Sequence, residues 1–102
     1  MIITFEAAPV DDRGRLLHAE DPLAQTCLAF VRLESELAGH GLSTADITTL
    51  WVLSADVRPD PDLLAVLAER FGPAAPPMRL TVVGDLGRPG MTIGLRADVD
   101  AD

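Results

Sequence analysis

Lysine is absent from this chain of 102 residues, and all 8 of its basic residues are arginine. A Schiff-base enzyme needs a lysine amine, and the phosphate loop of nucleotide-binding proteins depends on a lysine that reaches the phosphates. The sequence therefore excludes both of these chemistries.

Cysteine is nearly absent as well. Cys27 is the only cysteine, so no disulfide can form within the chain, and its apolar neighbours Leu23, Phe30 and Val31 indicate a thiol packed in a core. The N-terminus lacks the basic start and long apolar run of a signal peptide, and no apolar stretch reaches membrane-spanning length. We expect a protein of the reducing cytoplasm.

Positive charge is scarce, because 8 basic residues face 16 acidic ones and the net charge is −8. Nucleic acid and anionic membranes are poor partners for such a surface. Apolar residues nevertheless make up 48% of the chain, and the mean hydropathy is +0.24. We therefore expect part of the apolar surface to lie between subunits.

Metal-ligating patterns are also missing. His18 and His40 are each isolated from other ligating residues at metal-site spacing, so we expect neither a metal nor a cofactor. Gly84, Gly87 and Gly90 imitate a glycine-rich phosphate loop, but they lie between two expected strands rather than before a helix. They are typical of a hairpin loop.

The first half of the chain predicts two strands and a helix. Residues 2–8 favour an opening strand, and the turn residues that follow favour a short second strand at residues 16–18. A helix is expected to begin at Asp21-Pro22 and to end at His40-Gly41, where capping residues stand. Its apolar side chains recur at helical spacing and include Leu23, Cys27, Phe30, Val31, Leu37 and Ala38.

The second half predicts three more strands and another helix. Residues 47–54 are rich in β-branched and aromatic side chains, and residues 78–83 and 91–99 favour strands. Asp60-Pro61 repeats the helix-start signal, and apolar residues at helical spacing from Leu63 to Phe71 predict a second, shorter helix that ends at Gly72. The expected order is β-β-α-β-α-β-β. Residues 1–102 therefore predict one α+β domain, with two helices on one face of a mixed sheet.

Three stretches together carry a resemblance to a known family. They are residues 1–10, residues 21–56 with the turn Ala-Gly-His-Gly-Leu-Ser at 38–43, and the closing segment that begins at Phe71-Gly72 and contains Pro-Pro-Met-Arg at 76–79. Nearly the whole chain resembles the RidA/YjgF family. The resemblance implies a chorismate-mutase-like fold and a homotrimer with ligand sites between subunits. In active members it also implies a hydrolase, an imine deaminase that converts 2-imino or enamine acids to 2-oxo acids and ammonia.

Arg79 lies where the family carries its signature arginine, which grips the substrate carboxylate. The planar guanidinium can donate two parallel hydrogen bonds to a carboxylate, which a lysine cannot reproduce. Thr81 is two residues further along the same strand, so it shares a face with Arg79. In active relatives its position holds cysteine or another small polar residue. We predict that both residues bind substrate.

Other positions depart from the family's pattern. Phe5-Glu6 replace a serine-glycine pair, Leu64 replaces an asparagine, and Gly94 replaces a carboxylate that is often credited with handling water. Phe5, Glu6 and Gly94 are predicted to line the same substrate site. The chain also begins about one strand late relative to typical members, so a cleft-lining tyrosine has no counterpart.

Three functions remain open at this point. Imine hydrolysis gains about 10²–10⁴ in rate from a positioned acid or base, which Gly94 cannot supply, although Glu6, Asp85 or a backbone-held water could substitute. The catalytic residues are therefore unassigned, and the chain could be a diverged imine or enamine hydrolase. The alternatives are a module that binds a small carboxylate-bearing metabolite through Arg79, and an assembly module whose cleft is blocked by Phe5.

Overall fold

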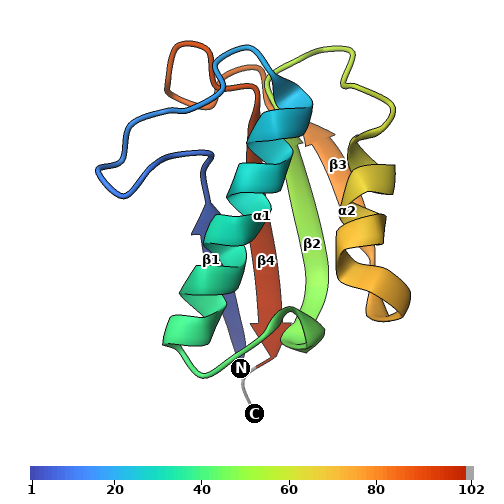
Figure 1. The fold of residues 1–102 in the computed structure, drawn as a ribbon. Helices are drawn as coiled ribbons and strands as arrows, with labels where there is room; N and C mark the ends of the chain where they lie inside the picture. The colour runs from blue at the N-terminus through green and yellow to red at the C-terminus, as the bar shows by residue number, and fades with distance from the viewer. Residues whose placement is uncertain (101–102) are drawn as a thin grey trace.

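The computed structural model describes residues 1–100, which form a sheet with both helices on one of its faces (Figure 1). The elements are β1 (Ile2–Ala7), α1 (Pro22–Gly39), β2 (Ile47–Ser54), α2 (Leu63–Phe71), β3 (Met78–Val82) and β4 (Ile93–Asp100), with short 3₁₀ turns at Thr44–Asp46 and Gly72–Ala74. The predicted α+β class with a mixed sheet is confirmed.

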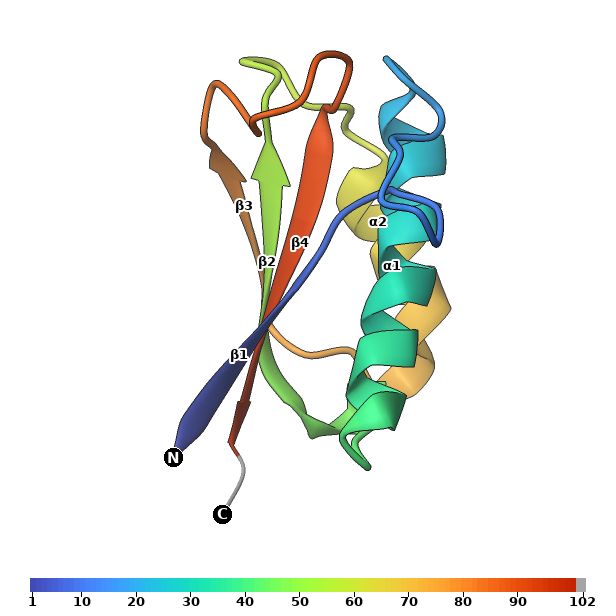
Figure 2. The same cartoon turned by 90° about the vertical axis from the view of Figure 1, so that its left-hand side faces the viewer.

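The strand order in the sheet is β1-β4-β2-β3, with β4 antiparallel to both of its neighbours and β2 parallel to β3. A parallel pair needs a crossover connection, and α2 supplies it on the same side as α1. Figure 2 shows the two helices together on one side of the sheet and no helix on the other side. Within residues 1–100, no helix is long and apolar enough to cross a membrane.

Residues 16–18 do not form the predicted second strand. Only an isolated bridge joins Val10 to Leu16. His18 and Glu20 adopt positive φ angles of 56° and 63°, which interrupt an extended strand. The predicted strand was therefore wrong, because turn residues before an apolar pair do not reveal the left-handed residues that follow. The predicted turn is present: the backbone N–H of Asp11 donates to the Arg15 carbonyl at 2.9 Å, and that of Leu17 donates to the Pro9 carbonyl at 3.0 Å.

The ends of α1 are confirmed, whereas α2 begins at Leu63 with Asp62 as its N-cap, later than the start predicted at Asp60-Pro61. The side chain of Asp21 accepts a hydrogen bond of 3.1 Å from the backbone N–H of Ala24, and Pro22 is the first helical residue. At the other end, Gly41 adopts a φ of +73°, a conformation that glycine reaches without strain.

The buried face of α1 is rotated relative to the prediction. Val31 is 47% exposed and Cys27 is only partly buried, which corrects two members of the predicted stripe. The buried residues are Gln25, Thr26, Ala29, Phe30, Leu33 and Leu37. Two of these are polar, so apolar spacing alone could not locate the buried face.

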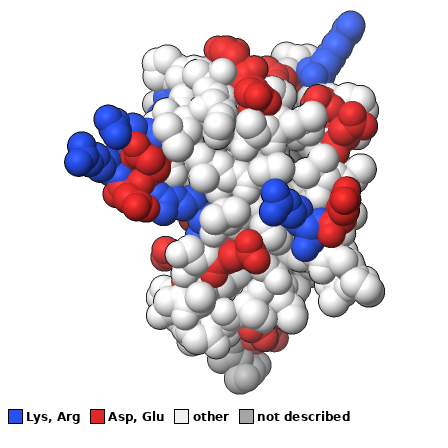
Figure 3. Space-filling model, in the orientation of Figure 1, with Lys and Arg blue, Asp and Glu red and all other residues white. Residues whose placement is uncertain are grey.

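The core lies between the helices and the inner face of the sheet. Leu33 of α1 and Leu67 of α2 are fully buried, as are Val52 of β2 and Val99 of β4. The inner residues of β4 alternate with outward ones, as predicted for a half-buried strand. The outer side of the helix layer carries its arginines in small groups beside acidic side chains (Figure 3).

Phe30→Ala is expected to lower the free energy of unfolding by about 3–5 kcal/mol. Phe30 is 3% exposed and meets the ring of Phe71 edge-on, with 5.0 Å between the ring centroids. Chemical denaturation measures the loss. Val31→Ala on the same helix is the control and should change stability by no more than about 0.5 kcal/mol. Equal losses for the two variants would contradict the assigned helix face.

Candidate ligand-binding face

The face of the sheet that the helices leave uncovered is called the open sheet face below. Strand alternation sends every second side chain to it, and residues paired across strands share it. Trp51 is in register with Arg79 on one side and Arg96 on the other, and Leu53 is in register with Thr81 and Gly94. The open sheet face thus brings Arg79, Thr81 and Gly94 onto one surface.

Trp51 lies at the centre of this face and is held in place by a hydrogen bond. Its indole Nε1 donates to Oδ2 of Asp98 at 3.1 Å, and the Thr4 hydroxyl donates to Oδ1 of the same carboxylate at 3.0 Å. The guanidinium carbon of Arg79 lies 5.5 Å from the centroid of the Trp51 ring, and that of Arg96 lies 5.9 Å away. Both contacts are within the range of cation–π attraction.

Within residues 1–100, the guanidinium of Arg79 has no carboxylate partner. Arg79 is exposed, and among residues 1–100 no acidic group lies within ion-pair distance of it. The Arg96 guanidinium, by contrast, has an Asp98 oxygen at 3.8 Å. Arg79 therefore keeps its hydrogen-bond donors available for a ligand.

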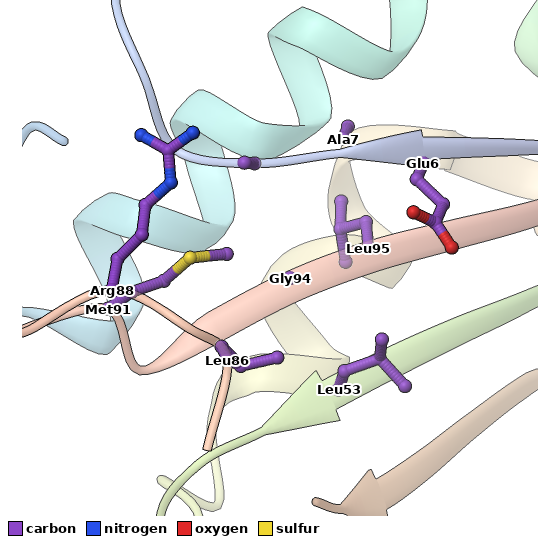
Figure 4. A pocket seen from close by; sticks show the side chains of 9 residues that line it. Glu6, Ala7, Leu53, Leu86, Arg88, Met91, Gly94 and Leu95 are labelled. Carbon is purple, nitrogen blue, oxygen red and sulfur yellow. The ribbon is translucent and has the colours of Figure 1, made fainter. Parts of the chain in front are cut away.

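A pocket of about 290 Å³ opens beside these residues, where β1, β2 and β4 meet the loop before β4 (Figure 4). Glu6 and Gly94, two of the residues predicted to bind substrate, line it together with Leu53 of β2. The remaining lining residues are Ala7, Ala8, Leu86, Arg88, Met91 and Leu95.

Gly94 forms part of the pocket floor. A Cβ atom at this position would lie 3.5 Å from Cε of Met91 and 3.7 Å from Cδ2 of Leu86, which is ordinary contact. The small residue leaves this part of the pocket apolar, and Glu6 is the only carboxylate among the lining residues.

Phe5 does not join the other predicted site residues. It is 5% exposed, lies in the core and meets the ring of His40 edge-on at 5.1 Å. Adjacent residues of a strand point to opposite faces, so Glu6 on the open sheet face requires Phe5 to face the helices. This placement corrects the expectation that Phe5 lines or blocks the cleft.

Arg88 was not anticipated as a site residue. It belongs to the loop between β3 and β4, and its Nη1 donates to the backbone carbonyl of Gly14. Gly14 belongs to a turn organised by Asp11, which accepts hydrogen bonds from the backbone N–H groups of Arg15 and Arg13 at 2.9 Å each. These bonds, that of Arg15 above all, hold the pKa of Asp11 below its ordinary value. No local sequence signal connects this turn with the pocket.

A second hollow of about 240 Å³ lies between β1 and α1. Its arginine, Arg32, already donates to the Val10 carbonyl and to the Asp12 carboxylate, both at 2.8 Å. The guanidinium of Arg32 is therefore already bound by groups of the same chain. Among residues 1–100, no group of three histidine, cysteine or acidic side chains could hold a metal ion.

The chain resembles known proteins in fold, whereas comparison by sequence finds no match. No family model matches the chain, and no curated protein matches it in sequence. Solved structures do match. A member of the YjgF/YER057c/UK114 family from Mycobacterium tuberculosis superposes with a TM-score of 0.78 at 23% identity, over 96% of this chain and 77% of that one.

Two further structures agree. A Rid-family protein from Yersinia pestis gives a TM-score of 0.75 at 24% identity, covering 96% of this chain and 77% of its own. The YjgF gene product of E. coli gives 0.81 at 20% identity, covering 99% and 81%. The sheet order, the two helices on one face and these superpositions together show that the chain has the fold of the YjgF/RidA family.

Proposed function

We propose that this protein binds small carboxylate-bearing metabolites on the open sheet face, in a cleft that a second copy of the chain completes. Arg79 is the carboxylate anchor. The observation that carries the proposal is the exposed Arg79 guanidinium, stacked on Trp51 and without an acidic partner among residues 1–100.

The stack on Trp51 prepares Arg79 for binding. Because the indole is fixed by Asp98, the guanidinium rests on an ordered surface and loses less freedom when a ligand arrives. A carboxylate can then accept two parallel charge-assisted hydrogen bonds from it. Thr81, on the same face and beside Leu53, places a hydroxyl next to the pocket.

A second copy of the chain is part of the proposal because one chain supplies only the floor of the site. Ligand pockets usually bury about 70–90% of a bound small molecule, and Arg79 lies on an exposed surface outside the pocket lining. A neighbouring chain packed against the open sheet face would provide the opposite wall. The resemblance of the sequence to the RidA/YjgF family, which implies ligand sites between subunits, supports this arrangement.

Arg79→Ala is expected to abolish binding of 2-oxobutanoate, as measured by calorimetry. The loss should exceed that of an ordinary hydrogen bond of about 1 kcal/mol, because a charge-assisted pair is removed. Arg79→Lys should restore part of the affinity, since an ammonium keeps the charge but lacks the fork. Arg70→Ala is the control, because Arg70 is exposed on α2 in the helix layer. Binding that survives Arg79→Ala would remove the anchor from the proposal.

Slow hydrolysis of 2-imino or enamine acids is the second candidate function. The observation that favours it is the Glu6 carboxylate, which lines the pocket together with Gly94 and offers a group that can accept a proton from water.

We expect turnover slower than that of a RidA-family protein that carries a carboxylate at the position of Gly94. Imines can be generated from amino acids with an oxidase, and the imines that have not been hydrolysed can be trapped with semicarbazide. Turnover as fast as the relative's would show that the missing carboxylate is dispensable.

A further inference from the structure

Two opposite charges stand at the two ends of the pocket on the open sheet face. Figure 4 shows Glu6 on β1 at one end and Arg88, from the loop before β4, at the other. Apolar side chains separate them, including Leu86, Met91 and Leu95. The pocket is therefore a short apolar trough with an acceptor at one end and a cationic donor at the other.

Neither charge forms an ion pair within the part of the chain that the structure describes. Within residues 1–100, Glu6 has no ion-pair partner, and its neighbour in register, Arg96, is directed to Asp98 and Trp51. Arg88 forms no ion pair in that part of the chain either, and its one hydrogen bond goes to the neutral carbonyl of Gly14. A guanidinium has five N–H donors, so most of those on Arg88 stay available.

The hydrogen bond to Gly14 also determines the position of the Arg88 guanidinium. The turn that carries Gly14 is braced by three hydrogen bonds to Asp11, two from backbone N–H groups and one from the Arg15 side chain. Arg88 is thereby held at the rim rather than free to fold across to Glu6. A ligand that bridges the two charges meets a separation that the fold has already established.

We propose that this pocket binds a small zwitterion of the ω-amino acid type, with a carboxylate at Arg88, an ammonium at Glu6 and an aliphatic spacer over Leu86 and Met91. The apolar side chains between the two ends favour a ligand whose two charges are separated by an aliphatic spacer over an α-amino acid, which carries both charged groups on one carbon. The proposal rests on the pocket that the proposed function also uses and names a ligand class for it. The two can be tested separately, because Arg79 lies outside the pocket lining and Arg79→Ala leaves both Glu6 and Arg88 in place.

The test is an NMR titration with 5-aminopentanoate, followed through the backbone amides of Leu86 and Gly94. The two matched probes, pentanoate and pentylamine, each carry one of the two charges. We expect 5-aminopentanoate to bind at least about tenfold more tightly than either, since each end adds a charge-assisted hydrogen bond. Glu6→Gln should reduce its affinity to that of pentanoate, whereas Glu69→Gln on the exposed side of α2 should not change it.

A second experiment reverses the charge at residue 6 and leaves the loop that carries Arg88 unchanged. Glu6→Arg places a cation at each end, so the variant should prefer adipate, the dicarboxylate of matching length, over 5-aminopentanoate. Glu6 is exposed on an edge strand, so the substitution disturbs no buried contact. Pentanoate binding as tightly as 5-aminopentanoate to the wild type, or an unchanged preference in Glu6→Arg, would overturn the proposal.

Discussion

Gln25→Leu is expected to lower the free energy of unfolding by about 3–5 kcal/mol, although it replaces a polar side chain by an apolar one of similar size. Gln25 is fully buried on α1. Its Nε2 donates to the carbonyls of His18 at 2.9 Å and Gly90 at 2.8 Å. Its Oε1 accepts from the backbone N–H groups of Thr92 at 2.8 Å and Ile93 at 3.2 Å.

The backbone N–H groups of Thr92 and Ile93 would lose their acceptor in Gln25→Leu, and a buried group without a partner costs about 1–3 kcal/mol. The carbonyls of His18 and Gly90 keep the hydrogen bonds that they accept from the backbone N–H groups of Asp21 and Glu20. Urea denaturation followed by circular dichroism measures the change. Glu34→Leu is the control, because Glu34 is exposed on the same helix, and it should stay within about 0.5 kcal/mol. A loss below about 1 kcal/mol in Gln25→Leu would mean that water replaces the lost bonds.

Gln25→Leu should also loosen the wall of the pocket on the open sheet face. Gln25 ties α1 to Gly90 and Thr92, which flank Met91 in the pocket wall. We expect faster hydrogen exchange at the amides of Thr92 and Ile93, because their acceptor is gone.

The second large effect concerns assembly. We propose that the protein is a homotrimer, so light scattering should return a mass near three times 10.8 kDa. Within residues 1–100, no helix covers the open sheet face (Figure 2). The edge strand β3 also exposes Leu80 and Val82, at 39% and 47%, on the face that is in register with the buried residues of β2, and Val83 after the strand is 42% exposed. Apolar surface of this kind favours contact with another chain.

Trp51→Glu should lower the mass toward that of one chain, because it places a carboxylate at the centre of the open sheet face. Val57→Glu is the matched control, since Val57 is 83% exposed in the loop before α2. Circular dichroism would verify that both variants fold. A wild-type monomer at micromolar concentration would remove the two-chain cleft on which the Arg79 site depends.

Several elements could be predicted from the sequence because their causes are local. The helix-start pair Asp21-Pro22 and the glycine at 41 mark the ends of α1, and the β-branched run at Ile47–Ser54 became β2 with the expected bounds. The spacing of two between Arg79 and Thr81 placed both on one face of β3. Hydrophobic periodicity, helix-capping residues and turn residues all depend on side chains that are only a few positions apart in the sequence.

Other features depended on partners far away in the chain. Gln25 can be buried because its amide meets backbone groups of residues 18 and 90–93, and this burial rotates the inward face of α1 away from Val31. Glu6 and Arg88 are far apart in sequence yet line one pocket. Such contacts are long-range, so no local pattern encodes them.

The sequence by itself therefore determined the fold class, the ends of α1, most strands and the sharing of one strand face by Arg79 and Thr81. Only the tertiary structure decided that this guanidinium rests on Trp51 without an acidic partner among residues 1–100, that Phe5 faces the core, and that Arg88 closes the pocket. The physical reason is that a strand's period determines which way a side chain points, whereas the strand order and the loop between β3 and β4 determine what it meets.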